Sequence, residues 1–400
     1  MVRIGTLPVR LLALDYGASL VWGPEIVDKA IIGATRQVDP RTGVVSFVKN
    51  GRSVFECHPL EKPRLIFQLG SADPQLAVEA LRVIENDVAG VGLNCGCPKS
   101  FSLQGGMGAA LLKDPERLCS ILEALVKATD LPIDAKIRLL PLPEPSTSAA
   151  APPAPAASDA APAPTAPTAD ALPSATTPAP APDTPTASSS EDPAAAAPPA
   201  EPTIPLVRLI LSTGIQNLTV HCRTQSMRSS QPALLARMAP LVALARDRGV
   251  PIVVNGDGDG WGNFARTCEV SGGVGAVMVA RGAEANVSCF RREGVLDPER
   301  DVIPRLLRVA LATNNHYSNT KYLLNAMNLH LSPTPPSRER NRALKQAMNQ
   351  ARSYEAMCAA FGIGEDEVEK ARDAGREGIE RLVPAWAERR SEIVRDEGEY

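Results

Sequence analysis

The 400-residue sequence has few of the residues from which metal sites and disulfide frameworks are built. It contains only four His, and its eight Cys include no paired CxxC spacing, so neither a zinc site nor a disulfide framework is predicted. No apolar run approaches the ~18 residues of a membrane-spanning helix. The N-terminus lacks the apolar segment of a secretory signal. We therefore expect a reduced, cytoplasmic protein without metal or membrane contact, with a nuclear pool left open.

Outside residues 141–203, short apolar runs alternate with amphipathic helical patterns. Seven runs are predicted as strands, at residues 19–22, 64–69, 90–94, 133–139, 215–221, 251–255 and 276–280. Helices are predicted between them, at residues 7–16, 74–85, 115–129, 205–213 and 232–247. This alternation predicts parallel βαβ units and an α/β fold, a (β/α)8 TIM barrel whose first strand is missing before Met1. Asn50-Gly51 predicts a hairpin beside the barrel.

Lysine, arginine and aromatic residues are absent from residues 141–203, where 18 of the 63 residues are proline. Such a segment buries too little apolar surface to offset its ordering entropy, so we predict disorder. Without its seven acidic residues the net charge of −3 becomes +4. A linker between two domains is one interpretation. We prefer an insertion in a barrel loop, because neither flank has enough strands to close a barrel, and long loops add little closure entropy.

From residue 298 the strand pattern stops. Helices are predicted at residues 302–314, 338–360, 365–373 and 375–396. The sequence thus divides into a barrel (1–140 and 204–297), an insertion (141–203) and an all-α helical domain (298–400). Residues 301–352 carry eight Lys and Arg against two acidic residues. That excess suits either a polyanionic partner or an ordinary solvated helix face.

The most informative stretch follows the strand at 90–94. It reads Asn94-Cys95-Gly96-Cys97-Pro98, and a glycine-rich loop follows at 105–108. A thiol just past a strand end is where an α/β enzyme places catalytic groups. The alternative is a buried structural cysteine, since free Cys is often buried. Pro98 and the nearby glycines favour the first interpretation, because inert core cysteines usually lie within regular elements.

This stretch resembles the active-site segment of the tRNA-dihydrouridine synthases, through NCGCPK at 94–99 and GGMGAALL at 105–112. The GGMG form is similar to that of the eukaryotic class acting at position 20 of the tRNA D-loop, as in fungi, without a double-stranded-RNA-binding module. MVRIGTLPVR at 1–10 and NTKY at 319–322 extend the resemblance. It implies a TIM barrel, bound FMN, NADPH as reductant, and reduction of the uracil 5,6 double bond in tRNA.

The resemblance also implies roles for individual residues. Cys97 matches the proton donor to C5, while hydride from the flavin reaches C6. Flavin contacts are expected from Gln68, Asn94, Lys136 and His221. Lys136 lies in an alternating strand, and an inward lysine is unfavourable unless it meets an anion. A surface lysine and a structural histidine are the alternatives.

The flavin phosphate is expected at the two last strands. Asn255, Gly256 and Asp257 follow one of them, and Ala280 and Arg281 follow the other. Loops at these two strand ends commonly hold phosphate in such barrels. The glycine-rich run at 256–262 follows a late strand and is no Rossmann fingerprint.

RNA contacts complete the prediction. Arg223 is expected to face the substrate and Arg228 an RNA phosphate, with a basic stretch at 338–352 gripping the tRNA. We expect a monomer. Two alternatives stay open: a small-molecule FMN oxidoreductase on the same barrel, and a non-catalytic RNA-binding relic that lost its first strand.

Overall fold

Seven parallel strands form the main sheet. The computed structural model describes residues 3–143 and 201–397, with side chains as far as residue 390. Neighbours in the sheet follow chain order, β1-β5-β6-β7-β8-β9-β10, and all pairs are parallel. The strands are β1 (Val21–Val27), β5 (Leu65–Gly70), β6 (Gly90–Asn94), β7 (Ile133–Arg138), β8 (Asn217–His221), β9 (Ile252–Asn255) and β10 (Ala276–Met278). The predicted α/β barrel class and its seven strands are confirmed.

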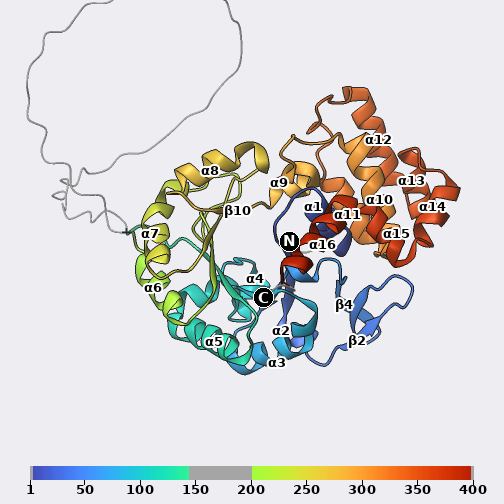
Figure 1. Ribbon diagram of the computed structural model, residues 1–400. Coiled ribbons are helices and arrows are strands. Elements are labelled where there is room, and N and C mark those ends of the chain that lie inside the picture. Colours follow the sequence, from blue (N-terminus) through green and yellow to red (C-terminus); the bar gives the residue numbers. More distant parts are fainter. Residues whose placement is uncertain (1–2, 144–200, 398–400) are drawn as a thin grey trace, which may run out of the picture. The chain divides into compact units, whose positions relative to one another are not determined.

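The sheet is curled, and the crossover helices lie on its outer face (Figure 1). These helices are α3 (Pro74–Ile84), α5 (Pro115–Ala128), α6 (Ile204–Ser212), α7 (Ala239–Asp247) and α8 (Phe264–Val270). Shorter helices connect the elements: α2 (Asp28–Ile31), α4 (Ser100–Gln104) and α9 (Arg281–Ala285). Among the described residues no backbone pairing joins β1 to β10. The sheet therefore has an open seam between these two strands.

Local sequence explains where the crossover helices begin. Asp73 caps α3 by accepting hydrogen bonds from the backbone N–H groups of Gln75 and Leu76. Asp114 caps α5 in the same way. Each cap is followed by proline at the first helical position, where its missing N–H has no intrahelical acceptor. The predicted helix at 232–247 is shorter than expected, because residues 235–238 form a 3-10 turn before α7.

A small antiparallel sheet decorates the barrel. Its strands are β2 (Thr35–Val38), β3 (Val45–Lys49) and β4 (Arg52–Cys57), in that order. Asn50 and Gly51 both have positive φ, as a type I′ hairpin turn requires, so the predicted hairpin is confirmed. β2 was not predicted, because all four of its residues are exposed and give no alternating pattern.

Helix α1 (Leu7–Asp15) is buried along its whole length. The helix predicted at residues 7–16 is confirmed. Its burial on every side was not predicted, because it comes from two helices at the far end of the sequence, α10 (Ile303–Ala312) and α16 (Pro384–Glu397), which also pack on α1. Asp15 forms an ion pair with Arg305 at 2.7 Å and accepts the backbone N–H of Trp386 at 3.0 Å. Helix α1 thus joins the barrel to the C-terminal helices.

The C-terminal helices belong to one compact unit with the barrel, made of Met1–Pro141 and Glu201–Tyr400. Besides α10 and α16 they are α11 (Tyr317–Ala326), α12 (Arg338–Gln350), α13 (Tyr354–Ala360), α14 (Glu365–Arg372) and α15 (Gly375–Leu382). The single helix predicted at 338–360 is wrong, because the chain breaks at 351–353 and Ser353 caps α13. Helix α11 was not predicted. The domain boundary at residue 298 stays a prediction.

The insertion leaves and rejoins the barrel at neighbouring points. The backbone N–H of Leu140 donates to the Thr203 hydroxyl at 3.1 Å. Arg237 donates to the Leu140 carbonyl at 2.8 Å and pairs with Glu201 at 2.7 Å. Glu201 and Thr203 fall within the predicted insertion, yet they make ordered contacts with the barrel. Residues 144–200 lie outside the described residues, and so does the prediction of their disorder.

Candidate functional site

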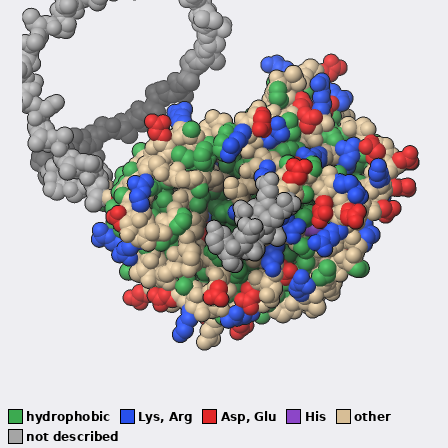
Figure 2. All heavy atoms as spheres, in the orientation of Figure 1, with side chains coloured by type: hydrophobic (Ala, Val, Ile, Leu, Met, Phe, Trp, Pro, Cys, Tyr) green, Lys and Arg blue, Asp and Glu red, His purple; other side chains and the backbone are tan. Residues whose placement is uncertain are grey.

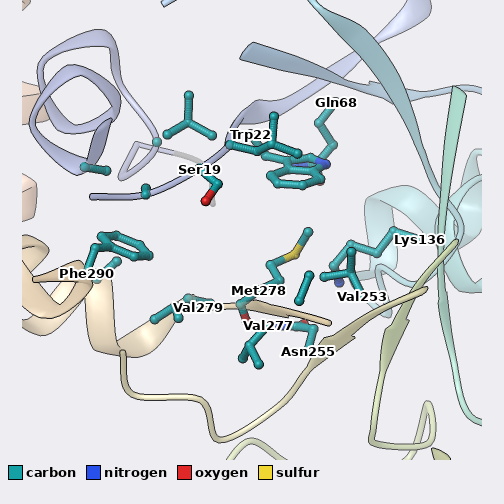
Figure 3. A pocket seen from close by; sticks show the side chains of 18 of the residues that line it. Ser19, Trp22, Gln68, Lys136, Val253, Asn255, Val277, Met278, Val279 and Phe290 are labelled. Carbon is teal, nitrogen blue, oxygen red and sulfur yellow. Dashed lines mark hydrogen bonds between the residues drawn. The ribbon is translucent and has the colours of Figure 1, made fainter. Parts of the chain in front are cut away.

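A cavity of about 500 Å³ lies at the carboxyl ends of the barrel strands and extends to the open seam (Figure 3). We call it the first cavity. Its apolar wall comes from the start of β1, from β9, from β10 with the residues after it, and from the 3-10 turn at 287–290; it includes Trp22, Val253, Val277, Val279 and Phe290. Its polar lining comes from strand ends: Gln68, Asn94, Lys136, Arg138, His221 and Asn255. Cys97, directly after β6, completes the lining.

The loop that carries Cys97 is held by local hydrogen bonds. The Asn94 side-chain oxygen accepts the backbone N–H groups of Gly96 at 3.0 Å and Cys97 at 3.1 Å. This arrangement turns the chain sharply away from β6, as asparagine side chains commonly do. Cys95, by contrast, is fully buried. The two cysteines therefore differ in access, and only Cys97 lines the first cavity.

Gly108 packs closely against the same loop. Its φ is +59°, and a Cβ there would lie 2.7 Å from the Cys97 carbonyl oxygen and 2.4 Å from the Ser102 hydroxyl. Ala109 donates its backbone N–H to the Cys97 carbonyl at 3.0 Å. Only glycine fits this position without moving the cysteine loop. The glycine-rich motif thus shapes the site without contacting a ligand itself.

Lys136 places a cation on the wall opposite the apolar strands. Asp134, Lys136 and Arg138 share one face of β7, and Lys136 and Arg138 line the first cavity. Burial lowers the pKa of Lys136 to about 8, and the charge of Arg138 acts in the same direction. In the part of the chain that the structure describes, the ammonium group has no hydrogen bond and no ion pair. Asp134 on the same strand offsets this repulsion only in part, and a partly buried cation without a direct ion pair favours an anionic ligand.

His221 is the last residue of β8 and lines the first cavity as well as a second, smaller cavity beside it, described below. Burial lowers its pKa to about 2, with added repulsion from Lys136, Arg138 and Arg223. The imidazole is therefore neutral at physiological pH. Its Nε2 lies 3.4 Å from a guanidinium nitrogen of Arg223. A neutral ring can accept that hydrogen bond and still donate from its other nitrogen.

Gln68 and Asn94 connect three strands at the cavity floor. The Gln68 amide donates to the Gly23 carbonyl of β1 at 3.0 Å. The Asn94 amide donates to the Gln68 oxygen at 3.4 Å. Because both side chains are partly engaged within the protein, their geometry is fixed before any ligand binds.

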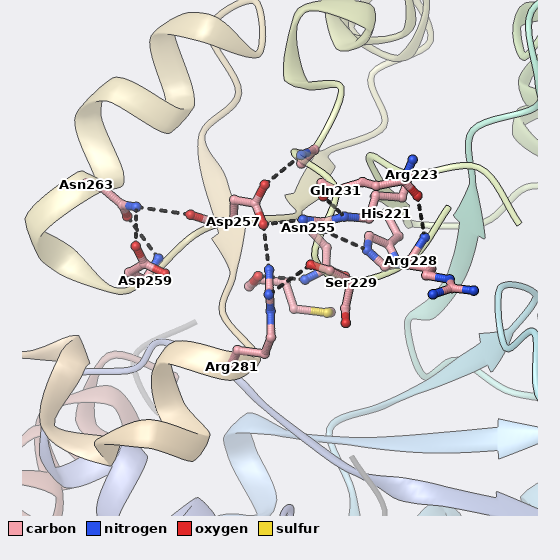
Figure 4. Close-up of polar contacts among 12 residues, drawn as sticks. His221, Arg223, Arg228, Ser229, Gln231, Asn255, Asp257, Asp259, Asn263 and Arg281 are labelled. Carbon is pink, nitrogen blue, oxygen red and sulfur yellow. Dashed lines mark hydrogen bonds and ion pairs between the residues drawn. The ribbon is translucent and has the colours of Figure 1, made fainter. Parts of the chain in front are cut away.

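A second cavity of about 200 Å³ adjoins the first and shares His221, Asn255 and Ala280 with it. The residues predicted to hold phosphate all line this second cavity: Asn255, Gly256, Asp257, Ala280 and Arg281. Asp257 lies at the centre of its polar contacts (Figure 4). It accepts from Arg223, from the Ala233 N–H at 2.6 Å and from Arg281 at 2.6 Å.

The charge of Asp257 is set by these contacts. Partial burial alone would raise the pKa of its carboxyl group, but hydrogen bonds from Arg223 and Ala233 and the charge of Arg281 lower it. Asp257 is therefore ionised and orients two arginines. One carboxylate against two guanidinium groups leaves one unit of positive charge at this end of the site.

The substrate roles expected for Arg223 and Arg228 stay predictions, and the two residues differ in their surroundings. Arg223 is only 3% exposed, and besides Asp257 its Nε donates to the Gln231 carbonyl at 2.8 Å. It organises the second cavity instead of facing open solvent. Arg228 is exposed and lines neither cavity. Every other predicted site residue lines one of the two.

Arg138 was not singled out from the sequence, although it lines both cavities. It donates to the Gly96 carbonyl at 2.7 Å and the Thr224 carbonyl at 3.0 Å. The signal was its position two residues after Lys136 on the same strand face. Trp22 and Phe290 gave no such signal, since only the fold brings them to the first cavity.

Two other kinds of feature, a metal site and a membrane-spanning helix, are absent from the described residues. No group of His, Cys, Asp and Glu there could hold a metal ion. Among the described helices, none combines the length and apolar character needed to cross a bilayer.

Comparisons with known proteins agree with the geometry. The chain is 41% identical over 372 residues to a tRNA-dihydrouridine(20) synthase (NAD(P)+) of Schizosaccharomyces pombe, covering 91% of this chain and 64% of that protein's length. It is 32% identical to the protein of the same name from Saccharomyces cerevisiae, covering 81% and 74%. The dihydrouridine synthase (Dus) family profile matches residues 1–143 and 199–370. The match includes the strands, the cysteine loop and both cavities, and the chain therefore belongs to the dihydrouridine synthase family.

Proposed function

We propose that this protein reduces the 5,6 double bond of a uridine in the D-loop of tRNA, at position 20, using FMN and NADPH. The names of the S. pombe and S. cerevisiae relatives, which specify dihydrouridine(20) and NAD(P)+, support this reaction. The observation that carries the proposal is the Lys136 ammonium group. It makes no hydrogen bond and no ion pair with any described residue, and the first cavity that it lines is also lined by Cys97.

The residues present fit FMN. The first cavity offers an apolar slot for a flat ring system, with amide groups of Gln68 and Asn94 at one end. Lys136 can neutralise an anionic ring edge. The adjoining second cavity has a surplus cation and loop glycines, which suits a phosphate group. Bound FMN, once reduced by NADPH, supplies hydride to C6 of the uracil.

Cys97 then has the role of general acid. A thiol at the cavity wall can deliver a proton to C5 from the face opposite the hydride donor. Proton transfer by a positioned side chain typically accelerates such a step by roughly 10²–10⁴-fold. Asn94 fixes the loop, and Gly108 allows the close packing behind it, so the sulfur is held in place before substrate arrives.

Arg281 is our candidate for the phosphate contact. Its guanidinium group is half-exposed at the second cavity and already oriented by Asp257 and the Ser229 carbonyl. Arg223, being buried, supports Asp257 and His221 from behind. Arg228, outside both cavities, can reach only a part of the tRNA beyond the reacting base.

The helical region from residue 298 is proposed to bind the tRNA body. Lys and Arg side chains, interspersed with Asp and Glu, are spread over this region (Figure 2). The cations of α12 divide into two groups. Arg340 pairs with Glu299, and Lys345 donates to the carbonyls of Asn325 and Met327.

Arg338 and Arg342 form the other group. They are exposed, and no described residue pairs with either of them. A uridine in folded tRNA must leave its stack to enter the first cavity, so phosphate contacts outside the barrel are needed to hold the RNA.

The test is a two-part measurement on the purified full chain. The flavin absorbance of the protein is recorded first, and tRNA lacking dihydrouridine is then incubated with protein and NADPH and mapped by mass spectrometry. We expect bound FMN and a mass gain of two hydrogens at a single D-loop uridine. A flavin-bound protein that reduces small enones but leaves tRNA unchanged would favour the small-molecule alternative.

A further inference from the structure

Glu25 is a half-buried residue near the cysteine loop, and one of its carboxyl oxygens is fully buried. It lies on β1, where the pairing with β5 shifts: Trp22 pairs with Ile66, but Glu25 pairs with Gln68. Three residues of β1 therefore match two of β5. This β-bulge turns Glu25 to the same face as Trp22 and Gln68, which is the cavity face. Bulges that re-aim a side chain in this way are common beside active sites.

The backbone of β5 leaves room for this side chain. A Cβ on Gly70 would lie 2.9 Å from the Glu25 Oε1 atom and 3.5 Å from its carboxyl carbon. The carboxyl group thus occupies the space where any other residue at position 70 would place its side chain. Oε1 is buried and has no hydrogen-bond partner among the described residues. A buried polar atom without a partner destabilises the folded state, so its presence calls for an explanation such as a functional role.

The groups around the carboxyl belong to the site. Glu25 pairs with Gln68, the Gln68 oxygen accepts from Asn94, and the Asn94 oxygen holds the backbone N–H of Cys97. Burial raises the pKa of Glu25, while Asn94, Cys97 and the charge of Lys136 lower it. Glu25 does not line the first cavity.

We propose that Glu25 is a positioning residue for Cys97, and that its carboxyl group returns a proton to the Cys97 sulfur after each turnover. This inference rests on the proposed function. In each cycle the Cys97 S–H bond breaks and a C–H bond forms at C5, while two electrons arrive as hydride at C6. The O–H proton of Glu25 then passes to the Cys97 thiolate, and water supplies a proton to the Glu25 carboxylate.

Other groups near the sulfur are poorly suited to this transfer. The Arg138 guanidinium is near Cys97, but it donates to two carbonyls and arginine does not release protons in proteins. Lys136 is assigned to the bound anion. Glu25 holds a proton to higher pH than an exposed glutamate because it is buried, which suits a group that alternates between acid and base.

The experiment compares the first turnover with later ones. In Glu25→Gln, the first turnover of pre-reduced enzyme with tRNA should match the wild type, because Cys97 begins with its proton. The steady-state kcat should fall about tenfold or more, with KM for tRNA unchanged and a larger solvent deuterium isotope effect. Rapid-quench mapping of dihydrouridine gives the rate of the first turnover, and NADPH oxidation gives the steady-state rate.

Two further variants keep the test decisive. Gly70→Ala retains the carboxyl but displaces it, and should also slow only the later turnovers. Glu56→Gln is the matched control, because Glu56 is likewise half-buried with a pKa raised by burial, but lies on β4. It should leave both rates unchanged.

Each outcome has a distinct meaning. If Glu25→Gln loses the first turnover as much as later ones, or loses neither, the relay is overturned while the proposed function stands. A wild type that forms no dihydrouridine would overturn the proposed function, and the relay with it.

Discussion

The backbone N–H of Cys95 donates to the carbonyl oxygen of Lys136 at 2.8 Å. This hydrogen bond continues the pairing of β6 with β7 one residue past the end of β6. It fixes the start of the Cys97 loop to the strand that carries the lysine. The loop that carries the proposed proton donor thus starts from the strand next to the one that carries Lys136, so both groups are anchored to adjacent strands of one sheet.

Lys136→Met should make the flavin-free protein more stable and remove its affinity for FMN. A lysine pKa lowered from 10.5 to about 8 corresponds to roughly 3 kcal/mol of destabilisation near neutral pH. Since the folded-state pKa is below the unfolded value, the unfolded state binds more protons between about pH 8 and 10.5. The free energy of unfolding of the flavin-free wild type therefore rises with pH across that window.

Urea unfolding of flavin-free wild type and Lys136→Met at several pH values measures this effect. The difference between the two proteins should be largest near neutral pH and should shrink toward pH 10. A variant that is less stable than the wild type at pH 7 would contradict the assignment of Lys136 as a destabilising, uncompensated cation.

Cys97→Ala should abolish dihydrouridine formation, by roughly 10²-fold or more in kcat, and leave bound FMN in place. The physical reason is that the thiol supplies a proton and makes no contact required for the fold. Flavin absorbance and mapped tRNA provide the two measurements. Cys119→Ala, on the outer helix α5, is the control and should behave as the wild type.

Gly108→Ala should destabilise the protein and slow catalysis together. Left-handed backbone at an L-residue costs about 1–2 kcal/mol, and the contacts with Ser102 and the Cys97 carbonyl should add roughly 1–3 kcal/mol of overpacking. Gly362→Ala separates the two causes, because Gly362 also has positive φ but no atom near its Cβ position. Equal unfolding free energies for the two variants would show that the loop contact is unimportant.

Glu61→Gln should lower the free energy of unfolding by roughly 3–5 kcal/mol, because it leaves a buried arginine without its counter-ion. Arg10 and Glu61 are 3% and 0% exposed and form a 2.7 Å ion pair. Chemical denaturation gives the value. Glu85→Gln removes the exposed pair with Arg82 and should change stability by less than ~1 kcal/mol.

Arg342→Ala should weaken tRNA binding and reduce the slope of log K against log salt by about one. The guanidinium group is exposed on α12, and no described residue pairs with it. Filter binding across a salt series measures the slope. Arg208→Ala, on an exposed position of the barrel helix α6, is the control; an equal effect there would indicate non-specific attraction.

Much of the barrel could be predicted from the sequence because its signals are local. The run of β6 and the Asp-Pro starts of α3 and α5 are each contained within a few residues. Strand alternation likewise placed Lys136 on the face opposite the apolar residues of β7, although it left a surface lysine as the alternative. These predictions needed no knowledge of distant contacts.

The misses share a different origin. The all-round burial of α1 depends on α10 and α16, which lie some 300 residues or more along the chain. The burial of Arg223 depends on Asp257, and the aim of Glu25 depends on a bulge that only pairing with β5 defines. Single-sequence patterns contain no information on such tertiary pairings.

The burial of α1 has a consequence for biogenesis. Its contact through Asp15 and Trp386 spans 371 residues, so a ribosome must add all of them before this helix is fully covered. Until then, leucines of α1 are exposed and available to chaperones. Shortened chains that end before α16 should therefore be degraded rapidly in cells, even though every residue proposed for catalysis is already present in them.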